Sequence, residues 1–172
     1  MLPEKRQAEV NRLKKIVNNP DFKTPADLEQ FFVAYTILIW DHKMIGMIYD
    51  YYVDDIVLHA EGGMDIVGVE AVVRNTTIKL NALPDYKTTF SEIFAVGNEE
   101  NGYRFVQVTN GRGSNLGPST LGPATGKTFT PDNIMNMCEC LVKKTNGKWK
   151  IVEEWVLGSA KRLDAIYKGS DF

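Results

Sequence analysis

Residues 130–157 read TPDNIMNMCECLVKKTNGKWKIVEEWVL, two runs with strand periodicity joined by Asn146-Gly147. Apolar and polar side chains alternate with a period of two in 130–143 and again in 148–157, as expected for strands with one buried face. An Asn-Gly pair tolerates the positive φ values that a two-residue hairpin turn requires. The stretch therefore predicts an antiparallel hairpin.

The rest of the chain extends this hairpin into a sheet and adds helices before it. Residues 86–96 and 103–110 also have strand periodicity, with Asn101-Gly102 as the turn between them. Helical periodicity marks four earlier segments, and a short β-rich run ends at the turn Glu61-Gly62-Gly63. The first predicted helix covers 3–18, and the second begins after Thr24, whose hydroxyl can cap it. A shorter helix runs from Asp41 through Tyr52, and a fourth from Gly68 to Pro84. The β-rich run is 55–59. Helices followed by antiparallel strands predict an α+β domain with helices on one face of a curved sheet.

Length and composition narrow the class of protein. The chain has 172 residues, 44% of them hydrophobic, and a net charge of −2 without a basic stripe. We expect one globular domain over 1–172, with 1–20 as an N-terminal helical extension, and no nucleic-acid partner. The polar start is not a secretory signal, and the apolar stretch 31–40 is too short to span a membrane. These features predict a cytoplasmic protein without a membrane partner.

Two cysteines, Cys138 and Cys140, are spaced i, i+2 in a predicted strand. A disulfide between such neighbours is strained. The chain has no other cysteine, and its only histidines are His42 and His59, so we expect no metal site. Two buried, reduced thiols are the simplest interpretation.

Residues 111–127 form a Gly/Pro-rich segment with five glycines and two prolines between two predicted strands. Its resemblance to a dinucleotide fingerprint fails at Leu116, where a glycine is required before a helix. A P-loop reading of Gly126-Lys127-Thr128 fails because Leu121 replaces the leading glycine and no helix can follow Pro131. Loops of this length in compact domains are often functional. We expect a lid or a pocket rim.

Carboxylates that interrupt apolar strand faces are the first candidates for acid/base chemistry. Glu92 lies among the even-numbered aromatic positions of 86–96, and Glu153 shares the odd positions with Trp149 and Trp155. An apolar environment raises a carboxyl pKa toward the range useful for proton transfer. Two alternatives stay open: a β-bulge would reverse either face, or an arginine such as Arg74 or Arg104 could pair with the acid.

His59 and Asp85 complete the set of candidate acid/base residues. His59 ends the β-rich run on the face opposite Leu58, and histidine titrates near neutral pH. A position at the mouth of a cavity would suit a proton shuttle, although a strand-end histidine is often only partly exposed. Tyr35, Phe90 and Trp155 are candidate walls of the same cavity.

Several motifs together resemble the SnoaL-like polyketide cyclases of the nuclear transport factor 2-like superfamily, over about residues 30–165. They are Asp50-Tyr51-Tyr52 leading into 53–59, Gly68-Val69-Glu70-Ala71, Leu83-Pro84-Asp85, residues 122–127 (GPATGK) and residues 150–155 (KIVEEW). The resemblance implies a cone-shaped α+β barrel of a curved, mainly antiparallel sheet, with helices on its concave face around one pocket. It also implies a homodimer packed through the sheet. The resemblance further implies an enzyme that needs no cofactor and that closes a ring in, or isomerises, a small hydrophobic carbonyl compound.

Two positions depart from the family pattern. The acid/base aspartate expected after the "E-x-W" motif is replaced by Ser159, and Asp164 lies about one helical turn further on, where we expect it to be outside the pocket. Gly111-Arg112-Gly113 lacks the histidine of the family's "G-T-H". Fold can be carried over from the resemblance, but activity cannot.

Two hypotheses therefore remain. The first is a cyclase- or isomerase-like enzyme with its acid/base among His59, Asp85, Glu92 and Glu153. Its substrate would contact Tyr35, Tyr52, Phe90, Trp155 and Ser159. The second is a non-catalytic module of the same fold that binds a small molecule or dimerises. A scaffold that binds a partner through the open sheet face is a weaker third possibility.

Overall fold

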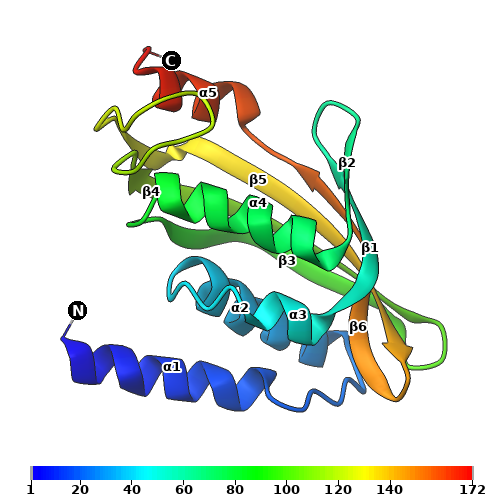
Figure 1. Ribbon diagram of the computed structural model, residues 1–172. Coiled ribbons are helices and arrows are strands. Elements are labelled where there is room, and N and C mark those ends of the chain that lie inside the picture. Colours follow the sequence, from blue (N-terminus) through cyan, green and yellow to red (C-terminus); the bar gives the residue numbers. More distant parts are fainter. Residues whose placement is uncertain (1, 172) are drawn as a thin grey trace.

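The computed structural model describes residues 2–171 and shows helices packed against a six-stranded sheet (Figure 1). The elements are α1 (Pro3–Val17), α2 (Pro25–Trp40), α3 (Met47–Tyr51), β1 (Tyr52–Ala60), β2 (Met64–Val67), α4 (Val69–Ala82), β3 (Lys87–Asn98), β4 (Gly102–Ser114), β5 (Thr128–Thr145), β6 (Lys148–Leu157) and α5 (Ala160–Lys168). The expected α+β class is confirmed. No helix within 2–171 is long and apolar enough to cross a membrane.

The strands follow the order β2-β1-β6-β5-β4-β3, and only the β1–β6 pair is parallel. The sheet curves around α2, α3 and α4, while α1 packs on the outer side of α2 (Figure 1). Its two edge strands, β2 and β3, do not pair with each other. The curved sheet is therefore open at these two edges, and the expected cone of a curved, mainly antiparallel sheet with helices on its concave face is confirmed.

Local sequence signals explain most of the element boundaries. Thr24 caps α2 in a capping box with Asp27, and Pro25 occupies the first helical turn. The β5–β6 hairpin turns at Asn146 and Gly147, which have φ values of 50° and 76°. The helix expected from Asp41 begins only at Met47, and the strand expected at 55–59 already begins at Tyr52. Sequence periodicity predicted neither β2 nor α5.

The main core lies between α2 and the concave face of the sheet. Phe32 on α2 stacks on Phe105 of β4 with a centroid separation of 3.9 Å, and Phe105 is fully buried. A second cluster, centred on Leu80, Leu83 and Phe129, fills the end of the molecule under α5. Between the two clusters, polar side chains face inward from the strands.

Candidate active site

An inner cavity lies between α2, α4 and the concave face of the sheet. It has two adjoining lobes, one of about 130 Å³ and one of about 110 Å³. The residues that line both lobes come from α2, α4 and strands β4, β5 and β6: Thr36, Trp40, Lys79, Gln107, Cys138, Glu154 and Val156. A single buried carboxylate, an amine and a thiol therefore share the centre of this cavity.

A wider hollow of about 340 Å³, here called the mouth, lies outside the lobes. The β1–β2 hairpin, α4, α5 and the loop residues Ser119 and Thr120 form its walls. Lys79 and Val156 line the mouth as well as both lobes, so these two side chains lie between the mouth and the inner cavity.

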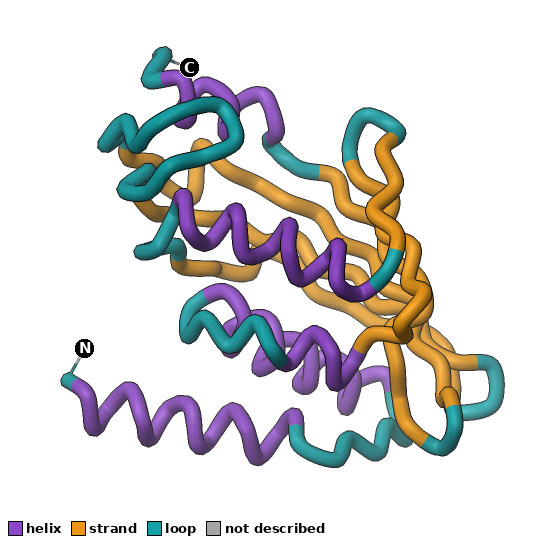
Figure 2. Tube along the Cα trace, viewed as in Figure 1, coloured by secondary structure: helices purple, strands orange, loops and turns teal. Residues whose placement is uncertain are grey.

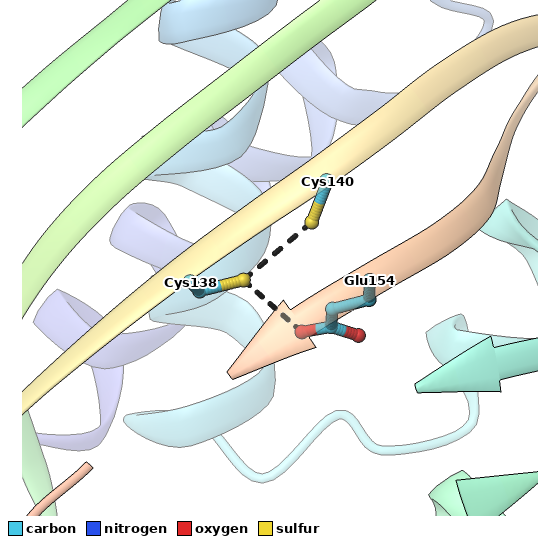
Figure 3. Close-up of side chains that lie close together, drawn as sticks. All are labelled: Cys138, Cys140 and Glu154. Atoms are coloured by element: carbon cyan, nitrogen blue, oxygen red, sulfur yellow. Dashed lines mark hydrogen bonds between the residues drawn. The ribbon is translucent and has the colours of Figure 1, made fainter. Parts of the chain in front are cut away.

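Glu154 on β6 is the central acidic group of the cavity, and only 7% of its surface is exposed. Its Oε2 accepts a hydrogen bond of 2.7 Å from the Tyr52 hydroxyl. Its Oε1 accepts one of 3.1 Å from the Cys138 thiol (Figure 3). Burial raises the pKa of Glu154 above its ordinary value, while these two hydrogen bonds and the charge of Lys79 oppose the rise. This environment suits a group that must both take up and release a proton.

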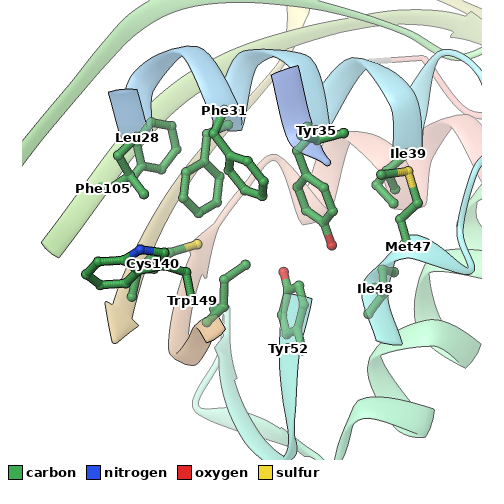
Figure 4. Packing of buried hydrophobic residues seen from close by; sticks show 14 of the residues in the cluster. Leu28, Phe31, Tyr35, Ile39, Met47, Ile48, Tyr52, Phe105, Cys140 and Trp149 are labelled. Atoms are coloured by element: carbon green, nitrogen blue, oxygen red, sulfur yellow. The ribbon is translucent and has the colours of Figure 1, made fainter. Parts of the chain in front are cut away.

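Two tyrosines point their hydroxyl groups toward one another in the core beside Glu154 (Figure 4). Both Tyr35 and Tyr52 line the larger lobe. Burial, reinforced by the charge of Glu154, raises both pKa values well above 10, so each phenol stays protonated and can donate. Within residues 2–171 the Tyr35 hydroxyl has no hydrogen-bond partner, which leaves a buried donor available to a ligand.

Cys138 and Cys140 lie side by side on β5, with their sulfur atoms 3.5 Å apart, and both are free thiols. Their sulfurs and a Glu154 oxygen all lie within 4.8 Å of one another. The hydrogen bond with Cys140 and burial raise the pKa of Cys138 well above its usual range. A protonated thiol is a poor metal ligand, so we interpret this group as a hydrogen-bond chain that ends on the carboxylate.

The structure corrects the predicted placement of Glu153 and Trp155. In β6, Ile151 pairs with Val142 and Glu153 pairs with Leu141, so Val152 forms a bulge that reverses the faces of the strand. Glu154 therefore faces the cavity, while Glu153 and Trp155 face the outer side of the sheet. The prediction that Glu153 is buried in the pocket was wrong, and its neighbour takes that position.

His59 also lies on the outer face rather than at the mouth of the cavity. Its Nδ1 is 2.8 Å from Asp65 and its Nε2 is 3.0 Å from Glu153, and its ring stacks on Trp155. Hydrogen bonds with Glu153 and then Asp65 raise the His59 pKa. The arrangement is a surface ion-pair network that is separate from the inner cavity.

A second bulge displaces Glu92. The register of β3 shifts between Phe90 and Glu92, so Glu92 lies with Phe94 on the exposed outer face of the sheet, away from the cavity. Phe90 is half-buried and lines neither the lobes nor the mouth. Asp85 is exposed and accepts a hydrogen bond of 2.8 Å from the Ser114 backbone, which gives it a structural contact. These three residues lie outside the candidate site.

Ser159 lies at the mouth, at the beginning of α5. Its hydroxyl accepts from the Met135 N–H at 3.0 Å and donates to the Met135 carbonyl at 2.9 Å, so it is tied to β5. Asp164 also lines the mouth, contrary to the expectation that it lies outside the pocket. The loop that follows β4 borders the mouth as expected for a rim, through Ser119 and Thr120, and lies beside α5 (Figure 2).

Glu154→Gln is expected to stabilise the fold, with a gain on the order of 1 kcal/mol that grows with pH. Burial raises the folded-state pKa of Glu154 above 4.5, so the wild-type protein loses stability as pH rises through that raised pKa. At pH values below the unfolded-state pKa of this glutamate, the wild-type protein does not have this loss of stability. Glutamine carries no charge and still accepts from Tyr52. Urea unfolding at about pH 5 and about pH 8 measures the gain.

Glu153→Gln is the control, because Glu153 is partly exposed. The polar groups around Glu154 belong to Tyr52, Cys138 and Lys79, and they are the same in both variants. A stability gain of Glu154→Gln that does not widen between the two pH values would contradict the raised pKa.

No protein-family model and no curated protein matches the chain. Solved structures do match its fold. A candidate SnoaL-like polyketide cyclase from Jannaschia sp. CCS1 superposes with a TM-score of 0.62 at 11% identity, over 88% of this chain and 99% of that one. A ketosteroid isomerase-like protein from Erwinia carotovora atroseptica SCRI1043 matches with a TM-score of 0.56 at 19% identity, over 74% and 89% of the two chains.

AclR, a candidate hydroxylase from Streptomyces galilaeus, matches with a TM-score of 0.62 at 18% identity, over 96% of this chain and 84% of that one. At such identities the likeness concerns the fold and not the chemistry. The chain therefore has the fold of the SnoaL-like polyketide cyclase and ketosteroid isomerase-like structures that it matches.

Proposed function

We propose that this protein is a cofactor-independent enzyme of the cyclase or isomerase type, which acts on a small hydrophobic carbonyl compound. The observation that carries the proposal is the environment of Glu154: a buried carboxylate, hydrogen-bonded to Tyr52, in a cavity that Lys79 also lines. Such a group is suited to remove a proton from the carbon beside a carbonyl group. We assign to Glu154 the acid/base role for which the sequence suggested His59, Asp85, Glu92 and Glu153.

The reaction needs a donor for the oxygen that becomes negative when the proton leaves. Tyr35 meets this need because its hydroxyl is buried, protonated and without a partner in the described chain. A donor that is fixed before the reaction stabilises an enolate more than water does. Tyr52 holds the Glu154 carboxylate in place through its 2.7 Å hydrogen bond.

Two outcomes are open to the enolate. Glu154 can return the proton to a different carbon, which isomerises the substrate. Alternatively, the enolate carbon can attack a second carbonyl group of the same molecule, which closes a ring. Apolar walls from Ile39, Ile48, Leu58 and Val72 line the larger lobe and favour a hydrophobic substrate.

Solvent exchange tests the proposal without knowledge of the natural substrate. Small ketones such as acetone and cyclohexanone are incubated with the protein in deuterated buffer, and proton NMR follows the loss of the hydrogens beside the carbonyl group. The protein is expected to accelerate this exchange over buffer. An exchange rate equal to that in buffer for every ketone tested would contradict an acid/base enzyme of this class.

A non-catalytic small-molecule binder is the alternative, and Ser159 favours it, because this serine stands where the resemblance implies an acid/base aspartate. A binder would show ketone-induced chemical-shift changes in the cavity residues without exchange at the ketone carbon.

The two free thiols, which need a reducing environment to persist, support a cytoplasmic location for either function.

We also propose that the protein forms a homodimer through the outer face of its sheet. Exposed apolar side chains gather on that face: Phe94, Val96, Met135, Met137 and Leu157. Sedimentation velocity over a micromolar concentration range is expected to show a dimer, and Phe94→Lys should weaken it at least about tenfold. Leu116→Lys is the control, because Leu116 is equally exposed but belongs to the loop. A wild-type monomer throughout would contradict the dimer.

A further inference from the structure

Lys79 occupies an unusual place for a lysine. It lies on the buried stripe of α4, three residues after the buried Thr76 and seven after the buried Val72. Residues at this spacing face the core of the protein. Although the residue is partly exposed, its side chain lines both lobes and the mouth. Lys79 thus lies where the two lobes and the mouth adjoin.

The amine is enclosed but has no close partner. Among residues 2–171 no carboxylate lies within 4.0 Å of the Lys79 nitrogen, and it takes part in no hydrogen bond. Burial lowers its pKa, against the opposing charge of Glu154. Because only a neutral amine is nucleophilic, this environment increases the reactive fraction at neutral pH.

We propose that Lys79 is a second catalytic residue, which forms an imine with an aldehyde or ketone substrate in the inner cavity. This inference rests on the proposed function and narrows its substrate class, because esters and carboxylic acids do not form imines. Glu154 lines the same two lobes and supplies the proton transfers that imine formation requires.

The steps balance without an oxidant or a reductant. The lone pair of the Lys79 nitrogen forms a bond to the carbonyl carbon, and the carbonyl oxygen takes up a proton from Glu154. The carbinolamine then loses water and becomes an iminium ion. The carboxylate removes a proton from the adjacent carbon, and the electron pair moves to nitrogen to form an enamine. After the proton returns or a carbon–carbon bond forms, water hydrolyses the iminium and releases the amine.

Lys43 is a matched control within the same chain. Burial lowers its pKa to about 8, yet it lies outside the lobes and the mouth. Its nitrogen donates to the Trp40 and Tyr86 carbonyl groups at 2.6 and 3.0 Å. Comparison of the two lysines therefore separates position in the cavity from a lowered pKa alone.

Reductive trapping tests the inference. The wild-type protein is incubated with acetone and sodium cyanoborohydride, which reduces an iminium to a stable isopropyl-lysine, and peptide mass spectrometry locates the adduct over time. Lys79 should be modified at least about tenfold faster than Lys43 or any exposed lysine. Lys79→Met should abolish the fast adduct, and Lys43→Met should retain it.

Equal labelling of all lysines, or fastest labelling of Lys43, would overturn the imine. Since these readouts use the wild-type chain, they hold even if Lys79→Met fails to fold. Ketone exchange that depends on Glu154 but proceeds at the wild-type rate in folded Lys79→Met would also overturn it, while the proposed function stands. A fast Lys79 adduct without any exchange would instead support the imine and contradict the acid/base role of Glu154.

Discussion

Replacing Glu154 with glutamine is expected to reduce protein-dependent ketone exchange by about 10²–10⁴-fold, the usual contribution of a general acid/base. Glutamine matches the size of glutamate and still accepts a hydrogen bond from Tyr52, so the cavity keeps its shape. It cannot take up a proton from carbon. Because the charge is removed from a site where burial opposes it, the variant should fold at least as well as the wild type.

The next residue in the chain provides the control for this substitution. Glu153→Gln makes the same chemical change on the outer face, where Glu153 contacts His59 at 3.0 Å. Its exchange rate should stay within about twofold of the wild-type rate. A larger loss in Glu153→Gln than in Glu154→Gln would mean that the faces of β6 are reversed in solution. Equal rates in both variants, unchanged from the wild type, would mean that Glu154 is not the base.

The contrast between these two glutamates shows where prediction from sequence fails. Period-two alternation placed Glu153 on the same face as Trp149 and Ile151, which is correct only up to Ile151. The extra residue in β6, Val152, reverses every later side chain. No sequence signal fixes the position of a bulge, although the even-numbered Val156 and the Glu153-Glu154 doublet are compatible with one.

The same limit applies to β3, while the helices and turns were easier to predict. The shift between Phe90 and Glu92 turned an expected buried carboxylate into an exposed one. In contrast, the cap at Thr24 and the turn at Asn146-Gly147 depend on neighbouring residues only, so they form as predicted. Local chemistry determines such features, and long-range strand register determines which carboxylate is buried.

Lys79 is a candidate site residue that the helical spacing of α4 could have indicated. The stripe Val72, Thr76 and Leu83 passes through position 79 at the same helical spacing, so a lysine interrupts an otherwise apolar face. The spacing alone cannot tell whether such an amine extends to solvent or stays enclosed. The packing of α4 over the sheet and the adjacent mouth decides that question.

The loop after β4 depends on Asn115, a polar residue with no exposed surface. Its Nδ2 donates to the carbonyl groups of Ala82 and Gly117, at 3.1 and 2.8 Å. Its Oδ1 accepts from the backbone N–H and the hydroxyl of Thr125, at 2.9 and 3.0 Å. One amide therefore fastens both arms of the loop to the end of α4, beside the mouth of the cavity.

Asn115→Ala is expected to destabilise the protein by about 2–4 kcal/mol, because it removes the four hydrogen bonds that this fully buried amide makes. For a chain of this length the melting temperature should fall by about 5–15 °C. Calorimetry measures the change. Asn81→Ala is the control: Asn81 is exposed and makes one hydrogen bond of 3.2 Å to the same loop, so its effect should stay within about 0.5 kcal/mol. An Asn115→Ala protein as stable as Asn81→Ala would show that the loop is not fastened through Asn115, and the rim of the mouth would then need another anchor.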